Sequence, residues 1–181
     1  MSRGLGDVYK RQVYNSSGYE KVEAIEALDG IVDIFLPDFK YISSEMAARY
    51  SNAPDYPEVA KRALAQMVKQ TGDAKFDERD MMKRGVIVRH LILPGHIKES
   101  KEAIRYLYET YGDQIYISIM NQYTPMPGIE KRFKNLGRTI TQKEYDEVVD
   151  YAIDLGVENG FIQEGETAKE SFIPQFDDTG L

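Results

Sequence analysis

The chain has 181 residues, of which 42% are hydrophobic and 29% charged, and this is the composition of one ordinary globular domain. Its net charge of −7 argues against a general nucleic-acid-binding protein, because such proteins usually carry a basic face. The absence of cysteine excludes disulfides and thiolate metal sites within this chain. With no apolar run near the roughly 20 residues of a membrane span and no secretory signal, we expect a cytoplasmic protein without membrane contact.

Residues 1–12, with the sequence MSRGLGDVYKRQ, show no amphipathic period and no helix cap. They resemble the translated adapter read-through found at the ends of metagenomic assemblies. We therefore expect a non-native leader, followed from Val13 by the tail of a longer protein. An ordinary flexible N-terminus is the alternative. Gly4 and Gly6 are not followed by the third glycine of a G-x-G-x-x-G motif and precede no helix, so they do not predict a dinucleotide-binding site.

Residues 13–176 alternate short apolar runs with amphipathic segments, and residues 177–181 form a polar tail. The apolar runs that predict strands are 13–15, 31–38, 86–93, 115–120 and 159–163. The expected helices are 20–28, 57–70 after a cap at Asp55, a segment from Ser100 to Gly112, and 141–156 behind a capping box of Thr141 and Glu144. This alternation predicts right-handed strand–helix–strand units and a parallel sheet covered on both faces. A doubly wound sheet and a barrel are both compatible with it.

Polar side chains follow or end four of the predicted strands. They are Asn15 and Ser17, then Asp38 and Lys40, then Arg89 and His90, and finally Asn121, Gln122 and Tyr123. In parallel α/β folds the strand-to-helix loops all open at the carboxyl ends of the strands, so these groups are expected to converge on one ligand. Asp38 and Lys40 lie two residues apart and should therefore face the same side of the sheet.

Each of these features also has a simpler interpretation. Asp38 and Lys40 can form a local ion pair, and His90 can be a hydrogen-bonded core histidine. The run Lys131, Arg132, Lys134 and Arg138 is typical of a solvated loop, and Tyr106, Tyr108 and Tyr111 of helix packing. Two histidines without cysteine make a weak case for a metal site. Lys40 as the Schiff-base lysine of an aldolase or isomerase would need a desolvated site.

The stretches VYNSSGY, DIFLPDFKY, VIVRHLILPG and YISIMNQYTPMPG, taken in order and spacing, resemble the C-terminal part of radical S-adenosylmethionine enzymes over about residues 13–176. The branch they resemble most is that of the pyruvate formate-lyase-activating enzymes and their homologues. This resemblance implies an α/β fold, namely a partial parallel TIM-type (β/α) barrel of about five strand–helix units whose N-terminal units are missing. In the full-length parent it implies a [4Fe–4S] cluster held by C-x3-C-x2-C, reductive cleavage of S-adenosylmethionine and hydrogen abstraction by a 5′-deoxyadenosyl radical. The implied partners are a glycyl-radical enzyme or another protein substrate, and reduced flavodoxin or ferredoxin as electron donor.

The resemblance also implies roles for individual residues. Asn15 replaces the acid of the family's D-T-N-G turn and, with Ser17, lies where the methionine part of the cofactor is oriented. Asp38 is expected to bind a ribose hydroxyl, and Lys40 to balance charge near the cofactor carboxylate. Arg89 matches an arginine near the cofactor or the substrate peptide, His90 replaces an aromatic residue, and Tyr123 falls where activating enzymes place a histidine.

The missing cysteines mean that this chain cannot hold the cluster and is expected to be inactive by itself. Either the N-terminal strands were lost with a truncated reading frame, which the odd first residues favour, or the chain is a degenerate paralogue. In the second case it would be a cluster-free binding or scaffold protein with the same half-barrel. A half-barrel exposes strand edges and an apolar face, so we expect the isolated chain to be poorly soluble or partly unfolded.

Overall fold

The computed structural model describes residues 10–162. Most of the expected leader, the polar tail 177–181 and the last residue of the expected strand 159–163 lie outside the described residues. Arg11 and Gln12, at the end of the expected leader, contact the sheet. Arg11 forms an ion pair with Asp77, and the Gln12 amide donates a hydrogen bond to the Asp33 carboxylate at 2.8 Å.

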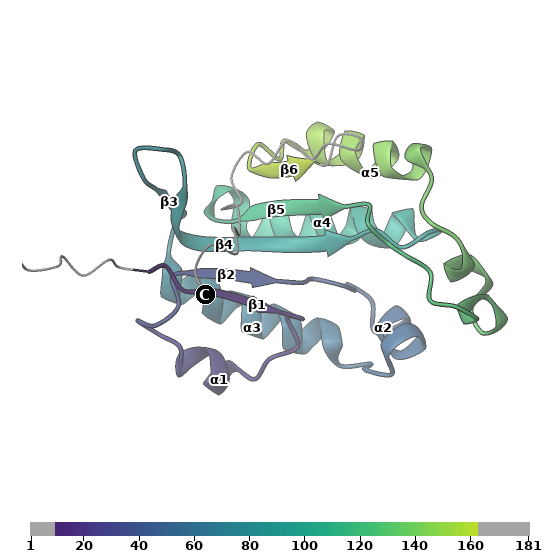
Figure 1. Ribbon diagram of the computed structural model, residues 1–181, viewed down its shortest axis with the longest axis horizontal. Helices are drawn as coiled ribbons and strands as arrows, with labels where there is room; N and C mark the ends of the chain where they lie inside the picture. The colour runs from purple at the N-terminus through teal and green to yellow at the C-terminus, as the bar shows by residue number, and fades with distance from the viewer. Residues whose placement is uncertain (1–9, 163–181) are drawn as a thin grey trace, which may run out of the picture.

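Within the described residues, five parallel strands form one open sheet in the order β1-β2-β4-β5-β6 (Figure 1). These strands are β1 (Val13–Ser16), β2 (Ile34–Pro37), β4 (Met82–Leu91), β5 (Tyr116–Met120) and β6 (Gly160–Ile162). The short strand β3 (Lys75–Phe76) pairs antiparallel with the start of β4. The helices are α1 (Val22–Glu26), α2 (Ser44–Ser51), α3 (Tyr56–Thr71), α4 (Ile97–Tyr111) and α5 (Gln142–Leu155), with 3-10 turns η1 (Gly112–Gln114), η2 (Ile129–Lys131) and η3 (Lys134–Gly137).

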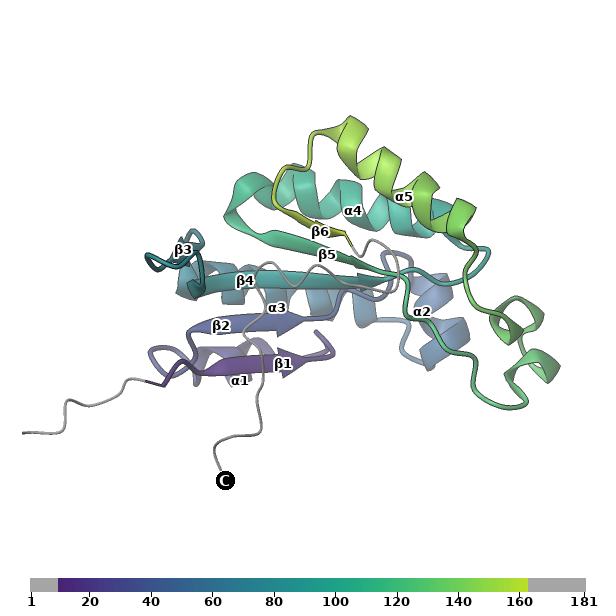
Figure 2. The same cartoon turned by 45° about the horizontal axis from the view of Figure 1, so that its top comes forward.

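The five parallel strands follow one another in the sheet in the same order as in the sequence. With right-handed connections, such an order places every crossover helix on one face. Figures 1 and 2 show α1, α3, α4 and α5 along that face, while α2 lies beyond the carboxyl ends of the strands. The order contains no reversal of the kind that defines a doubly wound sheet, and β1 and β6 lie at opposite edges. The predicted α/β fold with a parallel sheet is therefore confirmed, as an open sheet. The expected cover on both faces is wrong for residues 10–162, because the sequential strand order places all the crossover helices on one face.

The core lies between the sheet and the helices. Its fully buried members include Phe35 on β2, Val86 and Val88 on β4, Ile117 and Ile119 on β5, Met67 on α3, Leu107 on α4 and Val148 on α5. The helical spacing expected for residues 57–70 is largely confirmed. Ala60, Ala63, Leu64, Met67 and Val68 of the predicted face are buried, whereas Val59 is only half-buried. The three tyrosines of α4 pack against the same core, as the simpler interpretation predicted.

Several element boundaries differ from those expected. Helix α2 was not predicted, although Ser43 caps it by accepting from the Met46 amide at 3.3 Å and Asn52 ends it in the left-handed conformation. Strand β2 begins only at Ile34, because the amides of residues 31 and 32 both donate to the Leu28 carbonyl in the turn that ends α1. Strand β4 begins four residues before the expected start, because β3 supplies it with an additional pairing partner.

His90 is a core histidine with both ring nitrogens satisfied, as the simpler interpretation predicted. Its side chain is buried, with Nδ1 2.7 Å from the Phe39 carbonyl and Nε2 2.9 Å from Ser100 Oγ. A carbonyl oxygen only accepts, so Nδ1 carries the proton and, in the neutral ring, Nε2 accepts from the Ser100 hydroxyl. Burial lowers the pKa of His90 and so favours this neutral form.

Glu144 fastens the start of α5 to two neighbouring segments. It completes the predicted capping box, because Thr141 Oγ1 accepts from the Glu144 amide at 3.2 Å and the Glu144 carboxylate accepts from the Thr141 amide at 2.9 Å. The carboxylate also accepts from the Gly95 amide at 2.8 Å and pairs with Arg138 at 2.6 Å. The Arg138 guanidinium first of all, and then the backbone amides, hold the pKa of Glu144 well below its usual range.

We therefore expect Glu144→Ala to lower the free energy of unfolding by about 1–2 kcal/mol, the usual effect of losing a helix cap. Glu147→Ala on the same helix is the matched control, since Glu147 forms only a surface ion pair with Lys101 and should change stability by less than about 0.5 kcal/mol. Urea unfolding of the two variants measures the difference. Equal stability of the two variants would show that the Glu144 contacts contribute nothing beyond surface charge.

The exposed large hydrophobic side chains of the described residues are scattered over the molecule. They are Val13, Tyr19, Ile31, Met126 and Ile153, with exposures from 37% to 67%. On the sheet face away from the helices, Ile34, Ile87 and Met82 form a second buried cluster. These residues do not form one continuous apolar face, and the poor solubility or partial unfolding expected of the isolated chain remains a prediction. No helix in residues 10–162 has the length and apolar character needed to cross a membrane.

Candidate functional site

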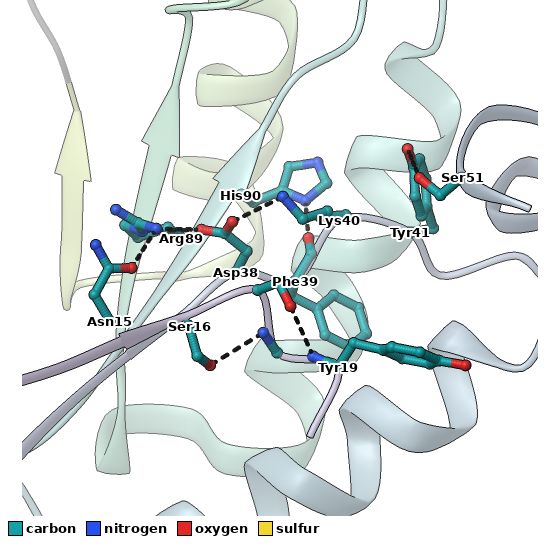
Figure 3. A network of polar contacts seen from close by, with 12 residues as sticks. Asn15, Ser16, Tyr19, Asp38, Phe39, Lys40, Tyr41, Ser51, Arg89 and His90 are labelled. Atoms are coloured by element: carbon teal, nitrogen blue, oxygen red, sulfur yellow. Dashed lines mark hydrogen bonds and ion pairs between the residues drawn. The ribbon is translucent and has the colours of Figure 1, made fainter. Parts of the chain in front are cut away.

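Asp38 and Arg89 meet where β2 and β4 run side by side. The two residues form a parallel bridge across the strands, and Arg89 Nε and Nη2 both donate to Asp38 Oδ1, at 2.9 and 2.6 Å (Figure 3). The side chains are only 18% and 28% exposed. A charge-assisted contact in a partly buried position is stronger and more fixed in geometry than a surface ion pair.

Lys40 forms an ion pair with the second carboxylate oxygen of Asp38. Its Nζ lies 2.9 Å from Asp38 Oδ2, so the predicted shared face and the predicted ion pair are both present. The Lys40 side chain is 41% exposed. This exposure and the neighbouring carboxylate are the opposite of the desolvated surroundings that a Schiff-base lysine needs, so the geometry does not favour an aldolase.

Asn15 joins the same network from β1. Its Oδ1 accepts from Arg89 Nη2 at 2.7 Å, so Arg89 connects the ends of three neighbouring strands (Figure 3). Ser17 lies outside the network, because its hydroxyl accepts only from the Tyr19 amide at 3.4 Å. The side chains of Asn15, Asp38 and Arg89 therefore come together, as predicted. Ser17 takes part only through its backbone carbonyl, which lies 2.9 Å from the Tyr56 hydroxyl.

A pocket of about 400 Å³ lies beside this network at the carboxyl ends of β2, β4 and β5. It is lined by Asp38, Lys40, Tyr41, Arg89, Leu91, Leu93, Met120, Gln122 and Tyr123. The lining combines charged groups with the apolar side chains of Leu91, Leu93 and Met120. Such a pocket has the size and mixed character of a small-molecule site, and suits a ligand with hydroxyl or carboxylate groups attached to an apolar part.

Tyr123 lines this pocket, and its hydroxyl is engaged elsewhere. The hydroxyl donates to the Leu136 carbonyl at 2.8 Å and so holds the loop between β5 and α5. Desolvation raises the pKa of Tyr123, which keeps the hydroxyl protonated as a donor. His96, the second histidine, lies at the start of α4, where Nε2 is 2.8 Å from the Tyr50 hydroxyl.

Tyr56 is a buried residue of the site region that the sequence did not single out. Its hydroxyl accepts from the Lys40 amide at 2.9 Å and lies 2.9 and 3.0 Å from the carbonyls of Ser17 and Asp38, to which it can donate. It thus ties the end of β1 to the end of β2 from the first position of α3. Burial strongly raises the pKa of Tyr56, which keeps this donor in place. No spacing signal points to it, because its partners are backbone atoms of two distant segments.

Asp55 lies at the cap position of α3 as expected, but its side chain does not cap the helix. It accepts instead from the Tyr19 hydroxyl at 2.7 Å, and the Tyr19 ring stacks on that of Tyr56. In the described part of the chain, no group of three or more His, Cys, Asp or Glu side chains is arranged to hold a metal ion.

Comparison with known proteins shows a similarity but does not show a family. No family model matches the chain. The chain is similar to an uncharacterized protein of Methanocaldococcus jannaschii, with 30% identity over 140 residues, which make up 77% of this chain and 37% of that protein. The chain thus spans well under half the length of this relative, and any activity of a longer protein is a matter of proposal.

Proposed function

We propose that the pocket at the carboxyl ends of β2, β4 and β5 binds S-adenosylmethionine, and that the chain is the C-terminal part of a radical S-adenosylmethionine enzyme with a partial TIM-type barrel. The observation that carries this proposal is that Asp38, Lys40 and Arg89 line one pocket that also has an aliphatic wall. The strand-end resemblance and the sequential strand order support it. By the same resemblance, the parent protein would be an activase of a glycyl-radical enzyme or act on another protein, with flavodoxin or ferredoxin as electron donor.

The residues of the pocket fit the parts of this cofactor. Asp38 uses one oxygen for Arg89 and the other for Lys40, and a carboxylate retains further lone pairs for the ribose hydroxyls. The two cations suit the cofactor's carboxylate, and Leu91, Leu93 and Met120 offer an apolar surface that excludes water. The cofactor itself supplies the radical chemistry when it is bound in the parent protein.

The residues of this chain do not fit the iron–sulfur cluster. The chain contains no cysteine, and clusters of this kind are held by cysteine thiolates. We therefore assign the chain only the binding and positioning of the nucleoside, with no redox step.

Calorimetric titration of the chain with S-adenosylmethionine tests this proposal. We expect saturable binding, and Asp38→Asn should weaken it by about tenfold or more, because hydrogen bonds to charged groups contribute about 1.5–3 kcal/mol. Asp113→Asn, which makes the same change at an exposed position before β5, should leave the affinity unchanged. Absence of binding to the folded wild-type chain, or equal binding by both variants, would contradict the proposal.

A cluster-free binding or scaffold protein is the second candidate, and the absence of cysteine favours it. Such a protein would also bind the nucleoside, so calorimetry does not separate the two candidates. The DNA upstream of Val13 does separate them. A continuous frame that encodes C-x3-C-x2-C supports the enzyme, whereas a native start codon near this position supports the scaffold.

A further inference from the structure

A cluster of exposed cations lies on the loop between β5 and α5, outside the pocket. We define the Phe133 basic cluster as Arg49, Lys131, Arg132 and Lys134, four exposed cations, of which Arg49 and Arg132 lie over the Phe133 ring. Arg49 comes from α2 and the others from η2, η3 and the turn between them. Figures 1 and 2 both show this loop beside α2, beyond the carboxyl ends of the strands.

Two guanidinium groups share one aromatic ring in this cluster. The Arg132 guanidinium lies 4.9 Å from the centre of the Phe133 ring, and the Arg49 guanidinium lies 5.9 Å from the same ring and 5.4 Å from that of Tyr50. The two rings meet edge to face at 4.9 Å, and the Tyr50 hydroxyl is bonded to His96. Cation–π contacts of this kind hold both guanidiniums in defined positions before any partner binds.

The cations of the cluster have no carboxylate partner among the described residues. The ion pairs of residues 10–162 involve none of the four. Glu45 lies one helical turn before Arg49, the spacing that usually gives an ion pair, yet the guanidinium lies over the aromatic rings instead. Glu99 on α4, which lines a pocket together with Arg49, accepts from the amides of Ile42 and Ser43. The four cations therefore have no ion pair within residues 10–162, although Glu45 and Glu102 line the same pocket as Arg49.

We propose that the Phe133 basic cluster is a docking surface for an acidic segment of a partner protein. The cations are spread along a loop and a helix end rather than directed at one point, so they fit a row of carboxylates better than a single phosphate. Guanidinium groups match carboxylates in planar, two-pronged hydrogen bonds. The negative net charge of the chain disfavours the longer, denser anion of a nucleic acid.

This surface adjoins the mouth of the pocket through the same loop. Tyr123 lines the pocket, and its hydroxyl donates to the carbonyl of Leu136, which lies two residues after Lys134. A protein bound to the cluster would therefore lie next to the pocket opening. The inference goes beyond the proposed function and does not depend on nucleoside binding, because it is derived from the charges of the surface alone.

Fluorescence anisotropy of a fluorescein-labelled oligoglutamate peptide, measured at low ionic strength without S-adenosylmethionine, tests the inference. We expect binding that weakens as salt is added, and a loss of about tenfold or more in the double variant Arg49→Glu, Arg132→Glu. The matched control is Lys75→Glu, Lys83→Glu, which makes the same change in charge on two exposed lysines of the β3–β4 hairpin, at the opposite ends of the strands. This control should lose less than about threefold, because the distant charges are screened.

The neutral double variant Arg49→Gln, Arg132→Gln keeps the test valid if charge reversal disturbs folding, and it should show a smaller loss in the same direction. Circular dichroism verifies that each variant is folded. Absence of peptide binding, or equal losses in the cluster and hairpin variants, would overturn the inference. Tighter binding of a labelled oligothymidylate than of the peptide would also overturn it, in favour of a nucleic-acid partner.

Discussion

Gly18→Ala is expected to lower the free energy of unfolding by about 3 kcal/mol or more, the range of backbone strain combined with a severe steric contact. Gly18 follows β1 with φ of +75°, a conformation that L side chains rarely adopt. A Cβ added there would lie 2.2 Å from the Asp38 carbonyl oxygen and 3.3 Å from the Tyr56 hydroxyl. Both are atoms that join the ends of β1 and β2, so the strand ends must move apart to admit the methyl group.

Gly30→Ala separates the two causes of this effect. Gly30 has almost the same backbone conformation, with φ of +74°, but nothing lies within 4 Å of a Cβ built there. The variant should therefore lose only the strain term, about 1 kcal/mol. Urea unfolding of both variants gives the two free energies. If Gly30→Ala is as destabilising as Gly18→Ala, the close approach of β1 to the Asp38 carbonyl has no energetic weight.

The stability of the chain is expected to fall as the pH is lowered from about 7 to 5, and His90 alone can contribute up to about 1.4 kcal/mol per pH unit, the limit for uptake of one proton. Burial lowers the pKa of His90 below its ordinary value of 6.5 and outweighs the opposing effects of its bond to the Phe39 carbonyl and of the Glu99 and Asp38 carboxylates. The folded chain therefore keeps His90 neutral, while the unfolded chain takes up a proton below pH 6.5. The contribution is fully present above that pH and is lost below it.

His90→Gln should remove most of this slope, whatever it does to stability at neutral pH. The chain has only one other histidine, His96, so variants of these two residues can test whether the pH dependence of stability comes from His90. Desolvation and the nearby Arg49 lower the pKa of His96 in the same direction, but its ring is less deeply buried, so His96→Gln should remove the smaller part of the slope. Chemical unfolding at several pH values gives the slope for each variant. A slope unchanged in His90→Gln would contradict the assignment.

The alternation of strands and helices could be predicted because each element carries its own periodic pattern. Helices α3 and α5 bury one face of a regular spacing, and the capping box of Thr141 and Glu144 is local in the sequence. Strand β3 has only two residues and so no periodicity of its own; it exists because it pairs with β4. Helix α2 had a readable signal in Ser43 and Asn52, but its eight residues include few apolar positions.

The candidate site also has one part that the sequence predicted and another that depends on the tertiary structure. Asp38 and Lys40 lie two residues apart in the extended segment directly after β2, so the sequence by itself determined that they share a face and meet. The sequence also determined that parallel strands would carry polar residues to one edge of the sheet. Arg89 lies 51 residues after Asp38, and it reaches that carboxylate only through the register between β2 and β4.

Tertiary structure alone decided which groups complete the site. Tyr56 ties two strand ends through backbone carbonyls and an amide, and backbone atoms are the same in every sequence, so no residue pattern reveals these partners. Arg49 and Arg132 share the Phe133 ring only because the loop after β5 packs beside α2. Local spacing thus determined most of the elements and the charged pair that follows β2, whereas contacts between distant segments, which depend on packing and register, decided the rest.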